Sequence, residues 1–170
     1  MRVYLVGFMG AGKTTAGRAL ARRMGALFVD LDARIEAAAG LTVAEIFARH
    51  GEGHFREEES RQLAATSAFS DVVVAAGGGT FERETNRATI AELGVSVFLD
   101  ARWDDVLRRL PGKREERPLF RTPEQALDLY RRRLPSYRLA DLTVVPGPGE
   151  DAETIAGRIV LLLERWRCDT

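Results

Sequence analysis

The chain has 170 residues, 29% of them charged, and its formal net charge at pH 7 is zero. This length suits one domain with a sizeable core, and the charge balance excludes an overall field that favours nucleic acid or membranes. No apolar run is long enough to span a bilayer, and the first ten residues lack the features of a signal peptide. The single cysteine, Cys168, excludes an internal disulfide, so we expect a cytoplasmic protein. We expect one domain over residues 1–170, and a monomer because no part of the sequence signals an interface.

Residues 7–15 read GFMGAGKTT and match the phosphate-loop pattern G-x-x-x-x-G-K-[ST]. Glycine at positions 7 and 12 lets backbone N–H groups turn inward around an anion, which a Cβ would obstruct. Lys13 offers a compact positive charge for the β- and γ-phosphates, and the Thr14 hydroxyl suits a Mg²⁺ ion. Of the 25 Lys and Arg residues only Lys13 and Lys113 are lysines, which fits a position that needs a point charge. The loop predicts a nucleotide site.

Strand-like and helix-like segments alternate along the chain, beginning with an apolar stretch over 2–8 and a helix up to Gly25. Further strands are expected at 26–32, 71–76, 95–100 and 142–147. Further helices are expected at 33–40, twice within 41–69, and at 81–94, 102–110, 122–137 and 151–166. Two of them have start signals, at Thr42 with Glu45 and at Thr122 with Pro123. This alternation predicts a three-layer α/β fold, a five-stranded parallel sheet with helices on both faces and ligands at the carboxyl ends of the strands.

Two acidic residues, Asp30 and Asp32, end the second expected strand on the same edge as the phosphate loop. Because they are two residues apart, alternation would point both side chains the same way. One could support Mg²⁺ through water while the other accepts a proton from an attacking hydroxyl. The alternative is that Asp32 only caps the following helix.

A charged stretch and a glycine run follow. Arg56 precedes three glutamates, and Arg with Glu59 at i+3 is ordinarily a helix-surface ion pair of small energy. Phe47 and Phe55 nearby could line a small pocket, or belong to the core. Gly77–Gly79 end a strand at a cost in folding entropy, which favours close approach of a ligand to the backbone.

Residues 111–121, PGKREERPLFR, have no apolar periodicity and concentrate basic side chains, including Lys113, Arg114, Arg117 and Arg121. A mobile basic lid over polyphosphate would have this composition, with Arg117 acting as an arginine finger, whereas a solvated loop is the alternative. Arg131–Arg133 are consecutive, so on a helix they point about 100° apart and cannot form one patch for nucleic acid. One of them can face a site.

Together these stretches resemble the shikimate kinases, whose pattern runs GFMGxGK[ST], DxD, FRxxE, GGG, RPLL and R-x-x-x-Y. This chain reads GFMGAGKT, DLD, FREEE, GGG, RPLF and RLPSY in that order, over nearly its whole length. The ordered set is far more specific than any one motif after the first. Phe120 stands at a usual leucine, and the late loop VVPGPGED lacks the arginine that some members use near the adenine.

The resemblance implies a P-loop kinase with a mobile lid at about 111–122, Mg²⁺ as cofactor and ATP as co-substrate. Thr14 and Asp30 would hold the ion, and Arg117 would close on ATP. The ATP contacts implied are Gly10, Ala11, Gly12, Lys13, Thr14, Thr15, Arg109 and Arg117.

The resemblance also implies that the acceptor is the 3-hydroxyl of shikimate, bound partly by a helical segment at about 32–62. Asp32 would hold the shikimate hydroxyls and act as the base, so the catalytic residues would be Lys13, Asp32 and Arg117. Arg56 and Arg133 would clamp the carboxylate beside Gly77, Gly78 and Gly79. Read without the resemblance, the residues indicate only a small α/β kinase with an anionic or polyol acceptor.

Three alternatives compete with this interpretation. A gluconate kinase would share the phosphate loop and an acidic residue after the second strand, but is not expected to carry FRxxE, GGG and RPL together. A nucleoside monophosphate kinase would need a base-reading pocket, and residues 42–67 show no obvious one. A catalytically silent nucleotide-binding module would not be expected to keep together the residues Lys13, Thr14, Asp30, Asp32 and Arg117.

Overall fold

The computed structural model describes residues 1–110, 119 and 122–169. Within them, five strands form one parallel sheet in the order β2-β3-β1-β4-β5. The strands are β1 (Arg2–Val6), β2 (Leu27–Asp30), β3 (Val72–Ala75), β4 (Val95–Leu99) and β5 (Leu142–Val144). This confirms the predicted parallel α/β fold.

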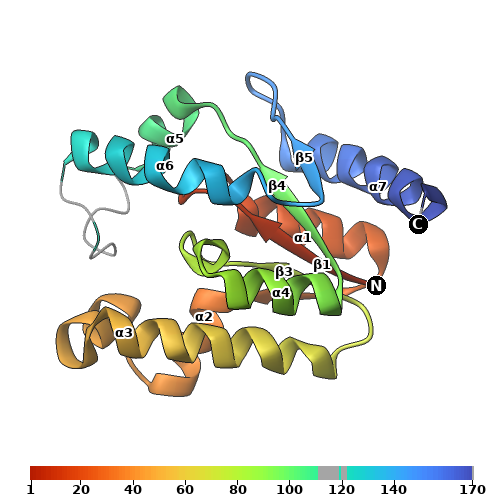
Figure 1. The fold of residues 1–170 in the computed structure, drawn as a ribbon. Coiled ribbons are helices and arrows are strands. Elements are labelled where there is room, and N and C mark those ends of the chain that lie inside the picture. Colours follow the sequence, from red (N-terminus) through yellow and green to blue (C-terminus); the bar gives the residue numbers. More distant parts are fainter. Residues whose placement is uncertain (111–118, 120–121, 170) are drawn as a thin grey trace.

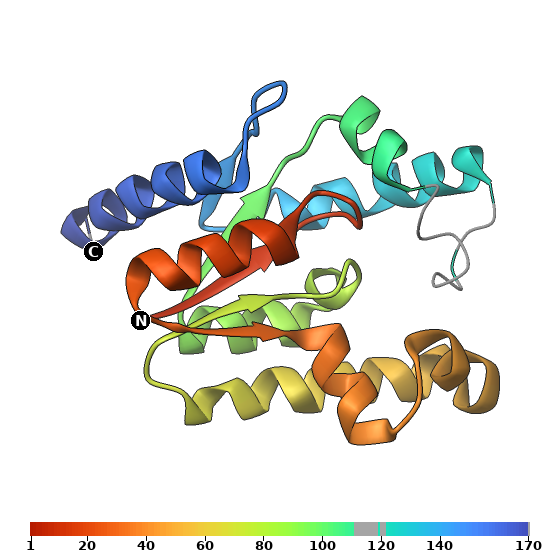
Figure 2. The same cartoon turned by 180° about the vertical axis from the view of Figure 1, so that it is seen from behind.

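Helices cover both faces of the sheet (Figures 1 and 2). The helices α1 (Lys13–Met24) and α7 (Ala152–Asp169) pack together on one face, and α4 (Glu84–Leu93) and α6 (Pro123–Tyr137) lie on the other. The pair α2 (Leu31–Ala39) and α3 (Val43–Ala64) lies beyond the β2 edge, and the short helix α5 (Trp103–Arg109) follows β4. Two 3₁₀ turns, η1 (Ala65–Ala68) and η2 (Thr80–Glu82), complete the described elements. No described helix combines the length and apolarity needed to cross a membrane.

The central strands are buried on both sides, as a covered parallel sheet requires. Residues 3–6 of β1 and 72–74 of β3 have no exposed surface. The expected helix starts are confirmed. Thr42 and Glu45 form a capping box at α3, and the Thr122 side chain accepts from the Gln125 N–H at the start of α6. Gly25 ends α1 in the left-handed conformation.

Several predicted boundaries are wrong. The first and last strands, expected over 2–8 and 142–147, end at Val6 and Val144. The second strand ends at Asp30 rather than 32, because the Asp30 side chain accepts from the Ala33 N–H and so begins α2 at once. The helix expected from 81 begins at Glu84, after the turn η2. The two helices expected within 41–69 are confirmed as the two halves of α3. They are separated by a kink at Gly51, whose φ of 82° and ψ of 168° are not helical.

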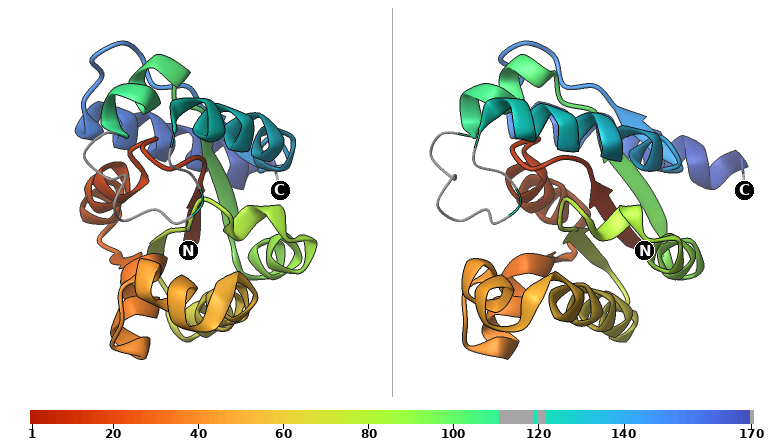
Figure 3. Two further views of the ribbon diagram at one scale, coloured as in Figure 1. Left: turned by 90° about the vertical axis from the view of Figure 1, so that its left-hand side faces the viewer. Right: turned by 60° about the vertical axis from the view of Figure 1, so that its left-hand side comes forward.

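The strand order places three loops side by side at one edge of the sheet. Because β2, β3 and β1 are neighbours and parallel, the start of α2, the glycines 77–79 and the phosphate loop follow adjacent carboxyl ends. The left view of Figure 3 looks onto this edge, with α3 on one side and α5 and α6 on the other.

Candidate active site

A cavity of about 930 Å³ opens at this edge of the sheet. It runs from the phosphate loop and residues near the start of α7 to α2, α3 and the glycines after β3. Every candidate site residue within the described part of the chain lines it: Gly10, Ala11, Gly12, Lys13, Thr14, Thr15, Asp30, Asp32, Arg56, Gly77, Gly78, Gly79, Arg109 and Arg133. The fold therefore brings motifs from distant parts of the sequence to one site.

The phosphate loop depends on glycine conformations. Gly10 and Gly12 have φ of 78° and 94°, where a side chain is strained. Gly7 also has positive φ, and a Cβ there would lie 2.8 Å from the Leu99 carbonyl oxygen. The Lys13 ammonium lies back across the loop and donates to the Gly7 and Phe8 carbonyls at 2.7 and 2.9 Å. The loop and the first turn of α1 thus present backbone N–H groups and one cation to the cavity.

Thr14 and Asp30 meet beside the loop. The Thr14 hydroxyl donates to Asp30 Oδ2 at 2.8 Å, while Asp30 Oδ1 accepts from the Ala33 N–H at 3.2 Å. A hydroxyl and a carboxylate oxygen are the hard donors that Mg²⁺ uses beside phosphate oxygens and water. The residues present therefore fit a magnesium ion bound together with a nucleotide.

Asp32 is the second residue of α2 and not part of a strand. The prediction that strand alternation points the Asp30 and Asp32 side chains the same way is therefore wrong. The chain turns into a helix between Asp30 and Asp32, and Asp30, not Asp32, is the cap. Asp32 nevertheless faces the cavity. A Cβ placed on Gly77 would lie 2.8 Å from Asp32 Oδ1 and 2.6 Å from Glu59 Oε1. Two carboxylates therefore converge on Gly77.

Arg56 is not on the helix surface, so the alternative of an exposed ion pair is wrong. Its side chain is 13% exposed, and its Nη1 donates at 2.9 Å to Glu59, which has no exposed surface. Glu52 accepts from Nε and Nη2 at 3.3 Å. Burial opposes the charge of Arg56, but the attraction of Glu59 and Glu52 is larger, so the pKa of its guanidinium is raised. Arg56 is held in place as a permanent cation.

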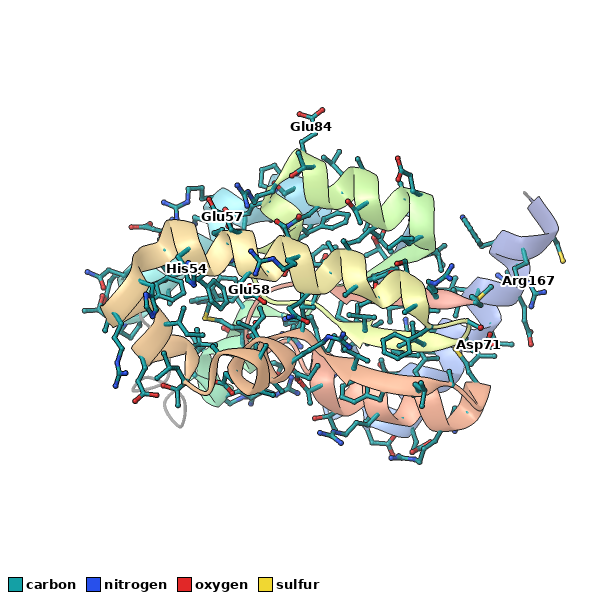
Figure 4. All side chains as sticks on the ribbon, turned by 90° about the horizontal axis from the view of Figure 1, so that it is seen from below. His54, Glu57, Glu58, Asp71, Glu84 and Arg167 are labelled. Atoms are coloured by element: carbon teal, nitrogen blue, oxygen red, sulfur yellow. The ribbon has the colours of Figure 1, made fainter. Side chains whose placement is uncertain are left out.

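Glu59, which the sequence indicated only as the i+3 partner of Arg56, is itself a residue of the site. Its Oε1 accepts from the Thr80 hydroxyl at 2.6 Å, so the carboxylate joins α3 to the turn after the glycines. The FREEE motif has three adjacent glutamates, and only the helical phase decides which one faces inward. Glu57 is exposed and Glu58 pairs with Arg61; both are labelled on α3 in Figure 4. The i+3 spacing from Arg56 predicts this pairing, and the structure shows that the pair is buried rather than exposed.

The three glycines make room for charged side chains of the site itself. A Cβ on Gly79 would lie 2.6 Å from Cζ of Arg56, and one on Gly78 would lie 3.1 Å from Nη1 of Arg133. None of Gly77, Gly78 and Gly79 has positive φ. The requirement is therefore for space rather than for an unusual backbone conformation.

Arg133 is the inward-facing member of its arginine triplet, as expected. Its side chain is 1% exposed, whereas Arg131 and Arg132 are exposed. Nε donates to Glu82 Oε2 at 2.8 Å, and Nη1 is buried without a hydrogen-bond partner among the described residues. One turn on, the Tyr137 hydroxyl donates to the Gly78 carbonyl at 2.5 Å. A buried, unpaired guanidinium nitrogen beside a cavity favours an anionic ligand.

Arg109, Phe47 and Phe55 also line the cavity. Arg109, the last residue of α5, donates from Nη1 to the Gly10 carbonyl at 3.0 Å. Phe47 and Phe55 pack with ring centroids 4.9 Å apart and both line the cavity. Arg117 and most of the expected lid, with Lys113, Arg114 and Arg121, lie outside the described residues; Leu119, which is described, lines the cavity.

The family model for shikimate kinase matches residues 9–164 of the chain. The chain belongs to the shikimate kinase family. A shikimate kinase from Bradyrhizobium diazoefficiens is 50% identical over 145 residues, 84% of this chain and 70% of that protein. One from Ruegeria pomeroyi is 43% identical over 164 residues, 95% of this chain and 84% of the relative.

Similarity to a solved shikimate kinase extends to the whole fold. The enzyme from Acinetobacter baumannii, solved in complex with shikimate, superposes with a TM-score of 0.91 at 35% identity, over 96% of this chain and 93% of the other. The ordered motifs had indicated the shikimate kinase family, and this prediction is confirmed. The chain is thus a kinase with the P-loop fold of its family.

Proposed function

We propose that the chain transfers the γ-phosphoryl group of ATP to the 3-hydroxyl of shikimate, giving shikimate 3-phosphate and ADP, a step of chorismate and aromatic amino-acid biosynthesis. One observation carries the proposal. A single cavity has the phosphate loop at one end and, among its other lining residues, Arg56 and Arg133, whose buried Nη1 has no partner among the described residues. A substrate with one carboxylate and several hydroxyls is complementary to that arrangement.

At the phosphate end, residues 10–15 would bind the ATP phosphates through backbone N–H groups and Lys13, with Arg109 alongside. Thr14 and Asp30 would hold Mg²⁺, which supplies charge neutralisation for the β- and γ-oxygens. Lys13 has to leave the carbonyls of Gly7 and Phe8 in part to reach a phosphate, and its flexible stem allows this.

At the acceptor end, Arg56 and Arg133 would bind the shikimate carboxylate, with Gly77–Gly79 letting both guanidiniums approach. Asp32 would accept a hydrogen bond from the 3-hydroxyl and take its proton. The hydroxyl oxygen then forms a bond to the γ-phosphorus while the bond from that phosphorus to the β–γ bridging oxygen breaks, and ADP leaves with that electron pair. The proton remains on Asp32 until water removes it.

Two regions complete the proposal. Residues 111–122 would form a lid that brings Arg117 to the transferring phosphoryl group and excludes water. Residues 32–62 would form the acceptor-binding segment, and the domain would act as a cytoplasmic monomer.

The test is a coupled ADP-release assay with shikimate, gluconate and nucleoside monophosphates as separate acceptors. Of these acceptors we expect only shikimate to be phosphorylated, and the rate should depend on added Mg²⁺. Lys13→Met should lower kcat by orders of magnitude with an unchanged far-UV CD spectrum. Turnover with gluconate or a nucleoside monophosphate instead would overturn the assignment. Binding of nucleotide without any transfer would favour a silent module.

A further inference from the structure

Arg133 is tied on one edge by a residue that belongs to none of the family motifs. Its Nε donates at 2.8 Å to Glu82 Oε2, in a pair where the Arg133 side chain is 1% exposed and the Glu82 side chain 30%. The other end of the fork, Nη1, has no partner among the described residues and lies against Gly78. The Nε side of the guanidinium is thus bound to Glu82, whereas Nη1 lies beside Gly78, and both Arg133 and Gly78 line the cavity.

The position of Glu82 is itself fixed. Glu82 ends the turn η2, and Arg87 Nη1 donates to the carbonyls of both Phe81 and Glu82 at 2.8 Å. Asn86 Nδ2 donates to the Thr80 carbonyl at 3.0 Å. These bonds anchor the turn to the first half of α4, so the Glu82 carboxylate is presented to α6 from a rigid base.

We propose that Glu82 is a positioning residue for the acceptor's carboxylate: it holds the Arg133 guanidinium by the Nε edge and so aims Nη1 into the cavity. The inference rests on the proposed function, because the anion concerned is the shikimate carboxylate. Without Glu82, the Nε of a nearly fully buried guanidinium loses its acceptor, and the long side chain turns toward another partner or solvent. Substrate then has to order the side chain again.

The position and the charge of Glu82 should have opposite effects on the affinity for shikimate. Glu82 orders Arg133, but its negative charge also opposes a second carboxylate nearby. Two substitutions separate these effects. Glu82→Gln keeps the length of the side chain and a hydrogen-bond acceptor for Nε while removing the charge. Glu82→Asp keeps the charge but is one methylene shorter, so it cannot hold the same geometry. Positioning predicts that Gln is the better replacement.

The experiment is calorimetric titration of shikimate into the wild-type chain and the Glu82 variants, with ADP titrated in parallel. We expect Glu82→Ala to raise the shikimate Kd about three- to tenfold, the cost of ordering one long side chain. Glu82→Gln should remain within about twofold of wild type or bind more tightly, and Glu82→Asp should bind more weakly than Glu82→Gln. The ADP Kd should not change in any of them.

Glu84→Ala is the matched control, because Glu84 is exposed two residues further on and points away from the molecule in Figure 4. It should leave both affinities unchanged. A second comparison uses Arg133→Ala: adding Glu82→Ala to it should change the shikimate Kd by less than about twofold, since Glu82 acts through Arg133.

Several results would overturn the inference. Unchanged or tighter shikimate binding in Glu82→Ala, Asp binding better than Gln, or full additivity with Arg133→Ala would each do so. If Glu82→Ala does not fold, the order of Gln and Asp decides alone. A wild-type chain that does not bind shikimate would overturn the proposed function and this inference with it, whereas normal wild-type binding with an indifferent Glu82→Ala overturns only the inference.

Discussion

Two aspartates at the start of α2, only two positions apart, make different contacts. Asp30 caps the helix and accepts from Thr14, whereas Asp32 lies in the first turn and faces Gly77 and Glu59. The cap is thus accounted for by Asp30, which frees Asp32 from the structural role that the sequence left open. This is consistent with the proton transfer that we propose for Asp32.

Replacing Asp32 by Asn should lower kcat by about two to four orders of magnitude, because the carboxamide is a very poor proton acceptor. The ATP Kd, measured by calorimetry, should stay near wild type. Asp30→Asn is the informative comparison, since Asn caps helices as well as Asp does. It should preserve the fold but raise the Mg²⁺ concentration needed for half-maximal rate. A normal kcat in Asp32→Asn would contradict the assignment.

Arg56 gives a second residue-scale prediction, in which binding and stability change together. Arg56→Ala should raise the shikimate Kd about tenfold to hundredfold, the loss of a charge-assisted contact of about 1.5–3 kcal/mol. It should also lower the free energy of unfolding by about 3 kcal/mol, because the fully buried Glu59 loses its cation. Arg56→Lys should recover only part of the affinity, since an ammonium cannot reproduce the planar fork.

The matched control is Arg61→Ala, which removes another i, i+3 pair from α3. Arg61 is 73% exposed and pairs with Glu58, so a few tenths of a kcal/mol is expected, with no change in shikimate binding. Urea unfolding and calorimetry measure both quantities. Equal stability changes in the two variants would show that Arg56 behaves as a surface residue.

At the scale of elements, the glycine run after β3 leaves space for side chains that come from α3 and α6. Arg56 comes from α3 and Arg133 from α6, and both guanidiniums lie against the backbone of residues 78 and 79. Because these glycines have ordinary φ values, other residues could adopt their backbone conformation. A larger side chain would nevertheless collide with the guanidiniums. A short segment of backbone thus determines where two cations from separate helices can lie.

Gly79→Ala should therefore displace Arg56 without unfolding the turn, since its φ of −99° and ψ of −7° suit alanine. The added Cβ would lie 2.6 Å from Arg56 Cζ, so the guanidinium must move. We expect the shikimate Kd to rise about tenfold with an unchanged ADP Kd. Gly53→Ala, where a Cβ meets nothing within 4 Å, is the control and should leave both values alone. Unchanged shikimate binding in Gly79→Ala would contradict the packing argument.

At the scale of the whole molecule, buried tyrosines make the stability of the fold depend on pH. Tyr137 is fully buried, and its hydroxyl ties α6 to the glycine run through Gly78. Burial raises the pKa of Tyr137 far above its ordinary value near 10, and Arg133 opposes this only in part. The pKa of Tyr4 is also raised by burial.

Because the folded state keeps the Tyr137 proton to a higher pH than the unfolded state, the neutral hydroxyl contributes to the free energy of unfolding. This contribution is complete below the unfolded-state pKa near 10 and is lost as the pH rises from there toward the folded-state pKa. Wild type should lose about 1 kcal/mol through Tyr137 between pH 8 and pH 11 that Tyr137→Phe does not lose. At pH 8 the variant should be less stable by about 1 kcal/mol for the missing hydrogen bond. Urea unfolding at both pH values should therefore show the gap closing. A gap that does not change with pH would contradict the burial argument.

The sequence alone determined the local chemistry and the order of elements. The phosphate loop, the caps at Thr42 and Thr122 and the apolar strands depend on neighbours close in the chain, so their patterns are visible without a structure. The ordered motifs also indicated the family. The structure decided what depends on helical phase and on contacts across long loops. The pair of Arg56 and Glu59 is buried at the site rather than exposed, Asp30 rather than Asp32 caps α2, and Glu82 binds Arg133 from 51 positions away. Such contacts are set when α3, α6 and the glycine run pack together at the sheet edge, because a side chain's partner across the fold is not encoded in its own neighbours.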